Sequence, residues 1–522
     1  MVNIAAQEHI DTEMNWRIRR EATTNSQIMS TLHKLTDVYG PRLTGSPNLR
    51  AAGEWAIEQL QAWGLTNGHL EPFEFGHPGW SNERLSVHVV SPVTDALVVE
   101  ALAWTPGTAG LVRAPVYHFT VPERPTASQL DAHLESVRAH IAGAVVMVGT
   151  PVTVGVTMTG GTRRREDAQL ERNFRRPPSG GGQRRGGGGT RSPRGEEDAE
   201  PPLAGREVEA KVAVFLRDAG AVARVNDAGR DHGQIRAFQN RTYDIEQAVP
   251  TVVMRNEDYG RLARLDAFGD VPVELELDIR NETHPDGRIA HNAIAELPGT
   301  DLADEVVMLG GHLDSWHAAT GATDNAIGVA VMMEAVRILS ALDVAPRRTI
   351  RVALWGGEEQ GLLGSQAYVE EHFGSAEEPT PQHELFAGYF NIDAGTGRAR
   401  GATVFGPPEA GELLDTVLAP FRDLGVIGAT TTRSRRRGGS DHTSFNEAGL
   451  PGISITQDPI QYGTYTWHTN LDTYERVLEH DAVASATTIA AAVYHLATRD
   501  DRLPRFPVET MPRSPASTSS QD

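Results

Sequence analysis

Residues 306–315 read VVMLGGHLDS, an apolar run that passes through two glycines to a histidine and an aspartate. A short continuous apolar run bounded by glycines is typical of a strand that is buried on both faces. His312 stands where this strand ends, and Asp314 points to the same side of an extended chain. We expect Asp314 to hold the second ring nitrogen of His312, as acceptors behind metal-bound imidazoles do. Taken alone, a histidine at a strand end is more typical of a buried structural residue.

The segments that follow repeat one order of apolar strand, polar turn and amphipathic helix. Strands are expected over 306–310, 350–355, 389–392 and 452–455, and helices over 326–342, 360–373, 412–424 and 481–498. Continuous apolar strands that alternate with helices predict an α/β fold, with a mostly parallel central sheet flanked by helices on both faces. In such sheets the ligand site lies outside the carboxyl ends of the strands.

Charged residues stand at the other strand and loop ends. They are Asp324, Glu358, Glu359, Asp393 and His468. Each has an ordinary explanation alone, since Asp324 is also a good helix cap and an acidic pair is favoured where a helix begins. Adjacent carboxylates between glycines, however, repel each other unless cations lie close by. Together with His312, these groups have no single structural explanation in common, and they indicate a metal centre.

The same groups suffice for two zinc ions that share one carboxylate. In this arrangement His312 and Asp393 bind one ion, Glu359 and His468 bind the other, and Asp324 bridges them. Each ion keeps a position for water. Glu358 is left over, and we expect it to take a proton from this water and give it to the leaving group.

Composition limits the alternatives. The chain has 522 residues, of which 39% are hydrophobic and 22% charged, and this predicts a globular protein with more than one domain. It contains no cysteine, so a metal site must use histidine and carboxylates. The net charge of -21 disfavours nucleic acid as a partner. No apolar run reaches about 18 residues, so we expect no transmembrane segment, and nothing in the composition indicates an oligomeric state.

The middle of the chain differs from the regular second half. Residues 111–269 contain short β-rich runs, 144–148 and 212–216 among them, and predict a β-rich domain inserted into a main domain formed by 1–110 and 270–500. Within it, 160–206 is rich in Gly, Arg, Pro and Glu and has few apolar residues, which predicts a disordered surface insertion. The tail 501–522 is expected to be flexible.

Beyond these patterns, the sequence resembles the co-catalytic zinc peptidases, a family that includes bacterial leucine aminopeptidases, glutamate carboxypeptidase and plasma glutamate carboxypeptidase. The matching segments are RLTGS (42–46), GGHLDS (310–315), TDNAIG (323–328), EEQGLLGS (358–365), NID (391–393), GSDHTSF (439–445) and HTNLDT (468–473). The resemblance implies the same metal roles residue by residue, with two Zn²⁺ per chain. It also implies a cis peptide between Asp324 and Asn325, and it identifies the β-rich region as similar to the protease-associated domain often inserted in this family.

The resemblance implies a zinc-dependent exopeptidase that hydrolyses terminal peptide bonds, acting as an aminopeptidase or as a carboxypeptidase or dipeptidase. Its substrate is then a peptide, and whether the amino or the carboxyl end is recognised stays open. The alternative is another reaction on the same site, that of a dipeptidase or of a glutaminyl-cyclase-like enzyme. A non-catalytic scaffold is disfavoured, because Glu358 and all the ligand positions are intact. Relatives with the inserted domain are usually exported, which favours secretion or a periplasmic location, although Met1 to Arg20 carries no secretory signal.

Several residues are implied as neighbours of the metals or the substrate. Family members use a tyrosine near the last histidine to stabilise the oxyanion, and Tyr462 and Tyr465 are both candidates. Asp441 and His442 belong to a loop that lies beside the catalytic cleft in this family, and we expect them to support the site or line the cleft. The arginine-rich run 433–437 precedes this loop and is either a clamp for a substrate carboxylate or a mobile surface loop.

Overall fold

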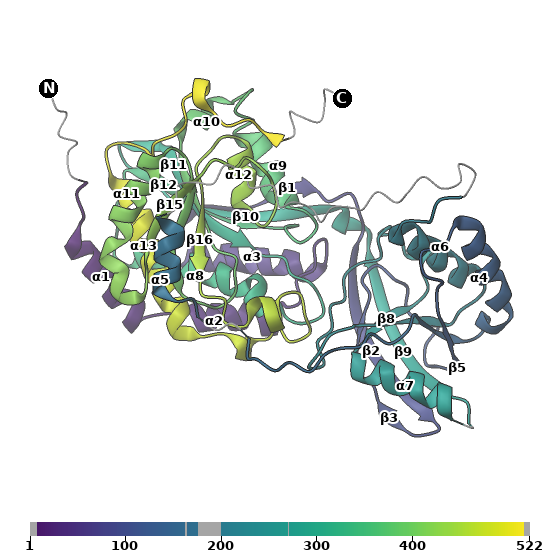
Figure 1. Ribbon diagram of the computed structural model, residues 1–522. Coiled ribbons are helices and arrows are strands. Elements are labelled where there is room, and N and C mark those ends of the chain that lie inside the picture. The colour runs from purple at the N-terminus through teal and green to yellow at the C-terminus, as the bar shows by residue number, and fades with distance from the viewer. Residues whose placement is uncertain (1–7, 162–163, 176–199, 270, 516–522) are drawn as a thin grey trace.

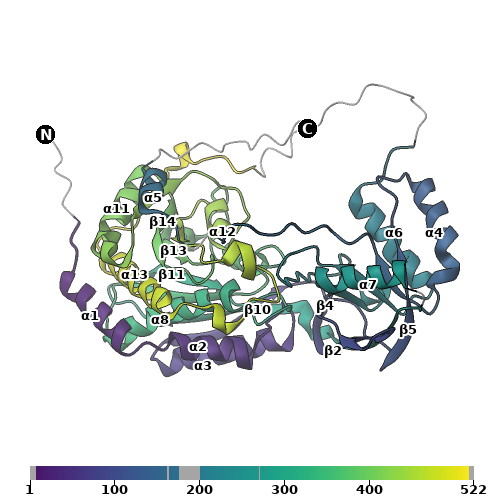
Figure 2. The ribbon, with the colours of Figure 1, turned by 60° about the horizontal axis from the view of Figure 1, so that its bottom comes forward.

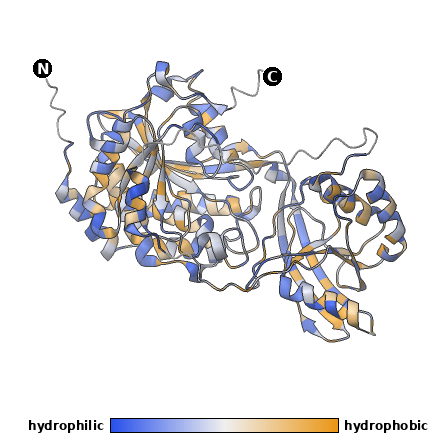
Figure 3. Cartoon of the chain, viewed as in Figure 1, coloured by the Kyte–Doolittle hydropathy of each residue, from blue (hydrophilic) through white to orange (hydrophobic). Residues whose placement is uncertain are grey.

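The computed structural model describes residues 8–161, 164–175, 200–269 and 271–515. They form two bodies that lie side by side, each built on a sheet of eight strands (Figure 1). We call the larger body the main domain and the smaller one, formed by the middle of the chain, the inserted domain. In both, apolar residues concentrate on the central strands and polar residues on the outer helices (Figure 3).

The sheet of the main domain has the strand order β1-β10-β12-β11-β13-β16-β14-β15. Its strands are β1 (Thr66–Glu74), β10 (Ile289–Leu297), β11 (Leu302–His312), β12 (Arg348–Trp355), β13 (Phe386–Asn391), β14 (Ala399–Phe405), β15 (Gly428–Thr432) and β16 (Gly452–Gln457). The four central strands, β12, β11, β13 and β16, run parallel, whereas β10 and β14 join them antiparallel on either side. The predicted α/β class and the parallel centre are confirmed, and the antiparallel strands are additional to the prediction.

Helices cover this sheet on both faces. They are α1 (Thr12–Thr24), α2 (Ile28–His33), α3 (Pro47–Ala62), α8 (Ile327–Ala341), α9 (Leu363–His372), α10 (Pro381–Leu385), α11 (Pro408–Leu418), α12 (His442–Glu447) and α13 (Glu479–Thr498). Shorter helical turns are η1 (Lys34–Val38), η4 (Ala322–Ala326), η5 (Ala419–Leu424), η6 (Tyr462–Thr466), η7 (Tyr474–Arg476) and η8 (Val508–Thr510). Among the described residues, no helix has both the length and the apolar character needed to cross a membrane.

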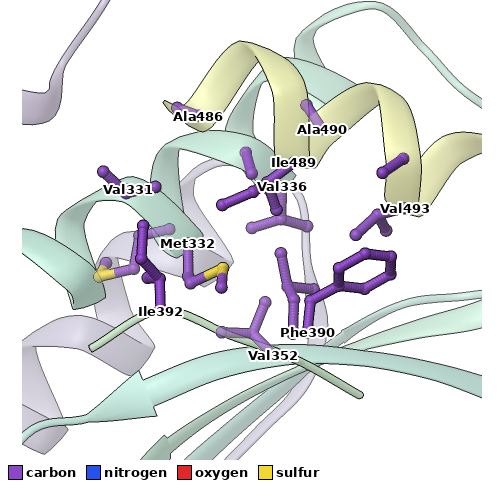
Figure 4. Packing of buried hydrophobic residues seen from close by; sticks show 14 of the residues in the cluster. Val331, Met332, Val336, Val352, Phe390, Ile392, Ala486, Ile489, Ala490 and Val493 are labelled. Atoms are coloured by element: carbon purple, nitrogen blue, oxygen red, sulfur yellow. The ribbon is translucent and has the colours of Figure 1, made fainter. Parts of the chain in front are cut away.

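The core of the main domain lies between the sheet and the helices α8 and α13. Figure 4 shows Val336 of α8 and Ile489 of α13 packed above Phe390 of the sheet. Residues 327–339 of α8 are all buried, and the two charged residues among them, Glu334 and Arg337, are paired with each other at 2.9 Å. Full burial of a side chain such as Phe390 stabilises the fold by about 1.5–3 kcal/mol, so this packing holds the parallel strands and their ends in place.

The inserted domain has the strand order β3-β2-β9-β5-β6-β7-β8-β4. Its strands are β2 (Gly79–Ser91), β3 (Asp95–Ala96), β4 (Val99–Ala101), β5 (Val112–Phe119), β6 (Val145–Val148), β7 (Ala223–Asp227), β8 (Thr251–Met254) and β9 (Glu274–His284). Its helices are α4 (Ala127–Ile141), α6 (Gly205–Asp218) and α7 (Asn256–Phe268), with the turns η2 (Ile245–Gln247) and η3 (Pro285–Arg288) at its margins.

The inserted domain extends beyond the expected boundaries at residues 110 and 270, because strands on both sides of them join its sheet. β2 pairs with β9 from Gly79 opposite His284 to Ser91 opposite Glu274, so both strands belong to the inserted domain. Val87 and Leu275 lie in its core. The alternating apolar pattern of these strands suits either sheet, and pairing partners distant in sequence decide which sheet they join.

A second correction concerns 212–216, which lies in helix α6 and not in a strand. Val212, Phe215 and Leu216 are buried, whereas Val214 is exposed. This spacing of three and four residues is the period of a helix, and a short apolar run alone does not distinguish it from a strand.

The expected disorder over 160–206 does not hold for residues 164–175, which we call the docked segment. It contains helix α5 (Asp167–Phe174), which lies against β15 of the main domain and not on the inserted domain (Figures 1 and 2). Leu170 is 1% exposed, and Phe174 lies over Gly401. The segment has few apolar residues, but these pack against the main domain. The local sequence contains no information about that distant surface, so the packing could not be predicted from it. Residues 162–163 and 176–199 lie outside the described part of the chain.

Ion pairs fasten the docked segment to the main domain, and one of them joins Asp167 to Arg400 of β14. The guanidinium of Arg164 lies 3.0 Å from the carboxylate of Asp458 and 2.8 Å from that of Asp481. Both carboxylates are buried in the main domain. The tail expected to be flexible is likewise packed as far as residue 515, since Leu503 and Phe506 are buried; residues 516–522 lie outside the described part.

Candidate metal centre

The carboxyl ends of the parallel strands bring the predicted ligands together. His312 ends β11, Asp393 follows β13 and Glu359 follows β12, while η4 carries Asp324 and His468 follows η6. The ligand atoms of His312, Asp324 and Asp393 all lie within 4.8 Å of one another, and so do those of Asp324, Glu359 and His468. The five predicted ligands therefore form two groups that share Asp324.

The distances within these groups match those around a metal ion. His312 Nε2 lies 3.3 Å from Asp324 Oδ1 and 3.3 Å from Asp393 Oδ1. His468 Nε2 lies 3.2 Å from Asp324 Oδ2 and 2.9 Å from Glu359 Oε2. Two ligand atoms about 2.0 Å from a tetrahedral zinc ion are themselves about 3.3 Å apart. Asp324 turns one oxygen to each histidine, which is the geometry that a bridging carboxylate requires.

The site contains more buried carboxylate oxygens than hydrogen-bond donors or positive charges to pair with them. Asp324 Oδ2 and Glu359 Oε1 are buried and have no hydrogen-bond partner among the described residues. Burial and the charge of Asp324 raise the pKa of Glu359 to about 7. Burial also raises the pKa of Asp393. Buried carboxylates that crowd together without donors are stabilised by cations, so this donor set fits a pair of divalent ions.

The histidines and these carboxylates change one another's pKa values. Burial lowers the pKa of His468, but the nearby carboxylates of Asp324 and Glu359 outweigh it and raise the pKa to about 9. For Asp324, burial raises the pKa, while His312 and His468 lower it further than burial raises it. The carboxylate shared by both groups thus keeps its negative charge, which is the form that binds a metal.

Asp314 has a different contact from the one expected. His312 Nδ1 lies 3.0 Å from the backbone oxygen of Asp314, and the carboxylate oxygen is farther away at 3.6 Å. Because a carbonyl oxygen only accepts, Nδ1 carries the proton and the lone pair of Nε2 faces the metal position. The carboxylate of Asp314 instead accepts from the backbone N–H groups of Glu358 and Glu359, each at 3.2 Å. Asp314 therefore orients the acidic pair as well as the histidine.

Asp472 is a supporting residue that the sequence analysis did not single out. Its carboxylate accepts the backbone N–H groups of Thr323 at 2.6 Å and of Asp324 at 3.0 Å. Burial raises its pKa to about 7. The signal was present, because Asp472 lies in the matching segment 468–473. The peptide between Asp324 and Asn325 is cis, as the resemblance implied.

Arg42 is a second supporting residue that was not predicted. It is fully buried and donates to four backbone oxygens, those of Leu35, Leu313, Thr320 and Gly321, at 2.6–3.1 Å. Two of these carbonyls flank the turn that leads into η4. Arg42 thus ties the N-terminal region to the loops that carry His312 and Asp324, and its segment 42–46 was the available signal.

A cavity of about 690 Å³ opens over the two ligand groups. It is lined by Asp324, Glu358, Glu359, Gly361, Leu362, Gln366, Asp393, Arg437, Gly438, Gly439, Tyr462, Trp467 and His468. Glu358 lines this cavity but belongs to neither ligand group. Burial raises the pKa of Glu358 well above its ordinary value.

The structure separates the two candidate tyrosines. Tyr462 lines the cavity and packs against Gly395, where an added Cβ would lie 2.9 Å from the Cβ of Tyr462. Burial and the charge of Asp324 raise the pKa of Tyr462 well above its ordinary value, so its hydroxyl stays protonated and able to donate. Tyr465 is not among the lining residues and instead lies 5.6 Å, ring centre to ring centre, from His232 of the inserted domain.

Asp441 and His442 lie behind the site. Both are outside the cavity lining and outside the ligand groups. Burial raises the pKa of Asp441 to about 7 and lowers that of His442 to about 4. Their neighbour Ser440 accepts a hydrogen bond from Asn391 Nδ2 at 2.8 Å, so this part of the loop supports the end of β13, and Asp441 and His442 do not line the cleft.

The inserted domain also contributes to the site, and no local residue pattern predicted this contribution. The ring of Phe238 lies edge-on to that of His468, with 5.6 Å between centres, and 5.0 Å from that of Trp316. The guanidinium of Arg236 lies 4.5 Å above the ring of Trp467. The wall beside His468 is therefore built from both domains.

Comparisons with known proteins agree with this geometry. Residues 292–494 match the sequence model of Peptidase family M28. The chain is 25% identical to carboxypeptidase Q of Mus musculus over 90% of its own length and 86% of that protein. It is 33% identical to leupeptin-inactivating enzyme 1 of Streptomyces exfoliatus, over 32% of this chain and 35% of that one.

Solved structures share the fold. A peptidase M28 precursor from Shewanella amazonensis superposes with a TM-score of 0.62 at 24% identity, covering 95% of this chain and 98% of the other. A zinc aminopeptidase from Bacillus subtilis gives a TM-score of 0.53 at 17% identity, covering 92% and 98%. Both likenesses extend over the main domain and the inserted domain together.

Proposed function

Because the chain belongs to peptidase family M28 through residues 292–494, we propose that it is a zinc-dependent exopeptidase that hydrolyses the terminal bonds of peptides. One observation carries the proposal: two groups of buried ligands share Asp324, and a further carboxylate, Glu358, lines the same cavity. The curated relatives named carboxypeptidase Q span nearly the whole chain, which supports the same reaction class.

The metal roles follow from the grouping. His312, Asp324 and Asp393 would hold one zinc ion, and Asp324, Glu359 and His468 the other. When bound, the ions would polarise the scissile carbonyl and make water a stronger nucleophile. Asp314 and Asp472 keep the ligands in place through the backbone of Glu359 and Asp324.

Glu358 performs the proton transfer in this proposal. Its backbone is held by Asp314, and its carboxylate lines the cavity without joining a ligand group. One carboxylate oxygen takes the proton of the attacking water and gives it to the nitrogen of the leaving amine. Burial raises the pKa of Glu358 above its ordinary value, and this direction favours transfer of the proton to the leaving group.

Tyr462 stabilises the charge that develops on the carbonyl oxygen. Its hydroxyl stays protonated in this environment and borders the same cavity as Glu358. A donor aimed at a developing oxyanion accelerates acyl transfer because the charge grows towards it.

We infer in addition that the inserted domain is of the protease-associated type. This assignment is supported by the position of the domain in the chain between β1 and β10 and by its β-rich sheet. Its residues Arg236 and Phe238 lie beside the cleft, a placement suited to shaping which peptides enter.

Removal and return of the metal test the proposed activity. Treatment with a chelator should abolish hydrolysis of a panel of dipeptides, and added Zn²⁺ should restore it. Zinc per chain, measured by mass spectrometry in parallel, should fall from two to zero and return to two. Undiminished hydrolysis by metal-free protein would refute the proposal.

A further inference from the structure

One charged group in the cavity has no role in the reaction described so far. The lining contains four carboxylates, those of Asp324, Glu358, Glu359 and Asp393, together with His468 and Arg437. The carboxylates and the histidine are committed to the metals or to proton transfer. No lining carboxylate is therefore left over to pair with a substrate ammonium group, whereas a guanidinium remains for a substrate carboxylate.

Arg437 stands apart from the other arginines of the run 433–437. Arg435 is buried and paired with Glu377 at 2.7 Å, and Arg433 lies 4.6 Å from the ring centre of Phe506. Both hold the chain to its surroundings. Arg436 is exposed and does not line the cavity. Only Arg437 of the run lines the cavity among the described residues.

The guanidinium of Arg437 is held in place from one side. Its Nε lies 2.8 Å from Glu447 Oε2, and its Nη1 donates to Gln366 Oε1. Its Nη2 has no hydrogen-bond partner among the described residues, and 46% of the side chain is exposed. An anchored planar fork loses little conformational freedom when it binds a further carboxylate, so it is prepared for such a partner.

The backbone beside Arg437 leaves room for a peptide. Gly438 and Gly439 both line the cavity and have φ angles of +125° and +98°. A Cβ built on either glycine meets no atom within 4 Å. Substrate backbone can therefore approach the guanidinium closely.

We propose that Arg437 binds the free α-carboxylate of the substrate, so that the enzyme acts on peptides or dipeptides with an unblocked carboxyl end. The inference rests on the proposed exopeptidase function and decides which peptide end is recognised. A guanidinium forms two parallel hydrogen bonds with a carboxylate, and in a cavity rich in acidic groups it also offsets their repulsion of that carboxylate. Arg437 is thus a specificity-determining residue and takes no part in bond cleavage.

Four forms of one dipeptide test the proposal on the zinc-loaded full chain: alanylalanine, its N-acetyl form, its amide, and the form blocked at both ends. We expect the two forms with a free carboxylate to be hydrolysed at least about tenfold more efficiently than the two amides. Preference for alanylalanine amide over N-acetyl-alanylalanine would overturn the proposal. Failure of the wild type to cleave any form while it holds two zinc ions would instead refute the peptidase function itself.

Substitution of Arg437 tests the residue directly. Arg437→Gln should raise KM for N-acetyl-alanylalanine about tenfold, with a smaller change in kcat, and leave the slow hydrolysis of the amides unchanged. Arg437→Lys should be intermediate, because it keeps the charge but loses the fork. Arg436→Gln is the matched control and should match the wild type. An equal loss on all four substrates in Arg437→Gln would show that the residue does not read the carboxylate.

A binding measurement separates recognition from turnover. In a Glu358→Gln background, calorimetry should show N-acetyl-alanylalanine binding about tenfold more weakly when Arg437→Gln is added. Zinc content and the thermal midpoint should be equal in both proteins. If Arg437→Gln does not fold, Gln366→Ala removes one anchor of the guanidinium and should raise KM for the free carboxylate forms alone. An unchanged KM in that variant, together with unchanged binding in Arg437→Lys, would also overturn the proposal.

Discussion

Both sheets have parallel strands at their centre, but the acidic residues near the ends of these strands differ in the hydrogen bonds that they accept. In the inserted domain, β7 ends at Asp227, whose carboxylate accepts from Val152 N at 2.7 Å, Gly229 N at 2.9 Å and Asn256 Nδ2 at 3.0 Å. In the main domain, the carboxylates of Asp324 and Glu359 each keep one buried oxygen without a donor among the described residues.

This difference separates Asp227 from the two carboxylates that we propose as metal ligands. A carboxylate that receives several N–H groups is neutralised by the protein itself and needs no cation. A buried carboxylate oxygen without a donor is costly unless a cation is present. Acidic residues lie near the carboxyl ends of parallel strands in both sheets, so the supply of donors distinguishes them. The following four variants test this contrast.

The largest effect is expected from Asp324→Ala. It removes the carboxylate that both ligand groups share, so both ions should bind poorly and kcat/KM should fall about a thousandfold or more. Zinc per chain after gel filtration and kcat/KM on a dipeptide measure this. Retention of two zinc ions would show that Asp324 does not bridge them.

Glu358→Gln should separate catalysis from metal binding. Zinc content should stay at two per chain, because Glu358 belongs to neither ligand group. kcat should fall about 10²- to 10⁴-fold, since the proton acceptor is lost while the shape is kept. If this variant lost its zinc instead, the division of roles between Glu358 and Glu359 would be wrong.

Asp472→Ala tests support from behind the ligands. The backbone N–H groups of Thr323 and Asp324 would lose their acceptor, and Asp324 would lose its fixed orientation. Outer partners of this kind typically contribute about 10- to 100-fold in metal affinity. Competition with a chromogenic chelator gives the zinc affinity, and an unchanged affinity would mean that Arg42 and the η4 turn orient Asp324 without help.

Asp227→Ala is the counterpart in the inserted domain and should have the smallest effect. Loss of its hydrogen bonds should reduce the free energy of unfolding by about 1–3 kcal/mol. Zinc content and kcat should not change, because the donors of Asp227 come from its own domain. Urea denaturation measures the loss, and a fall in zinc content would remove the contrast between the two sheets.

The strands and the candidate ligands of the main domain could be predicted because their signals are local. An apolar run ends in His312, another ends beside Asp393, and parallel strands bring such ends to one edge. Residues that act through backbone atoms were harder to predict. Arg42 and Asp472 donate to or accept from main-chain groups, and no residue pattern marks which carbonyl or N–H they will meet.

Long-range pairing limited the rest of the prediction. Arg164 and Asp481 are 317 positions apart, so the docking of α5 could not be predicted from the composition of its own segment. The same holds for β2 and β9, whose alternating pattern fits either sheet until the partner strand is known. Tyr462 and Tyr465 were equally good candidates from the sequence. Only the fold of η6 shows that Tyr462 is the one that borders the cavity.

The return of α5 to the main domain has a consequence for protein engineering. Glu74 of β1 and Ile289 of β10 are paired neighbours, so the two ends of the insertion look simple to rejoin after its excision. Such a truncation would also take away the cover of β15 and the partner of Asp458 and Asp481. The insertion is therefore not an exchangeable module, and a minimal or chimeric version of this protein must carry α5 with it.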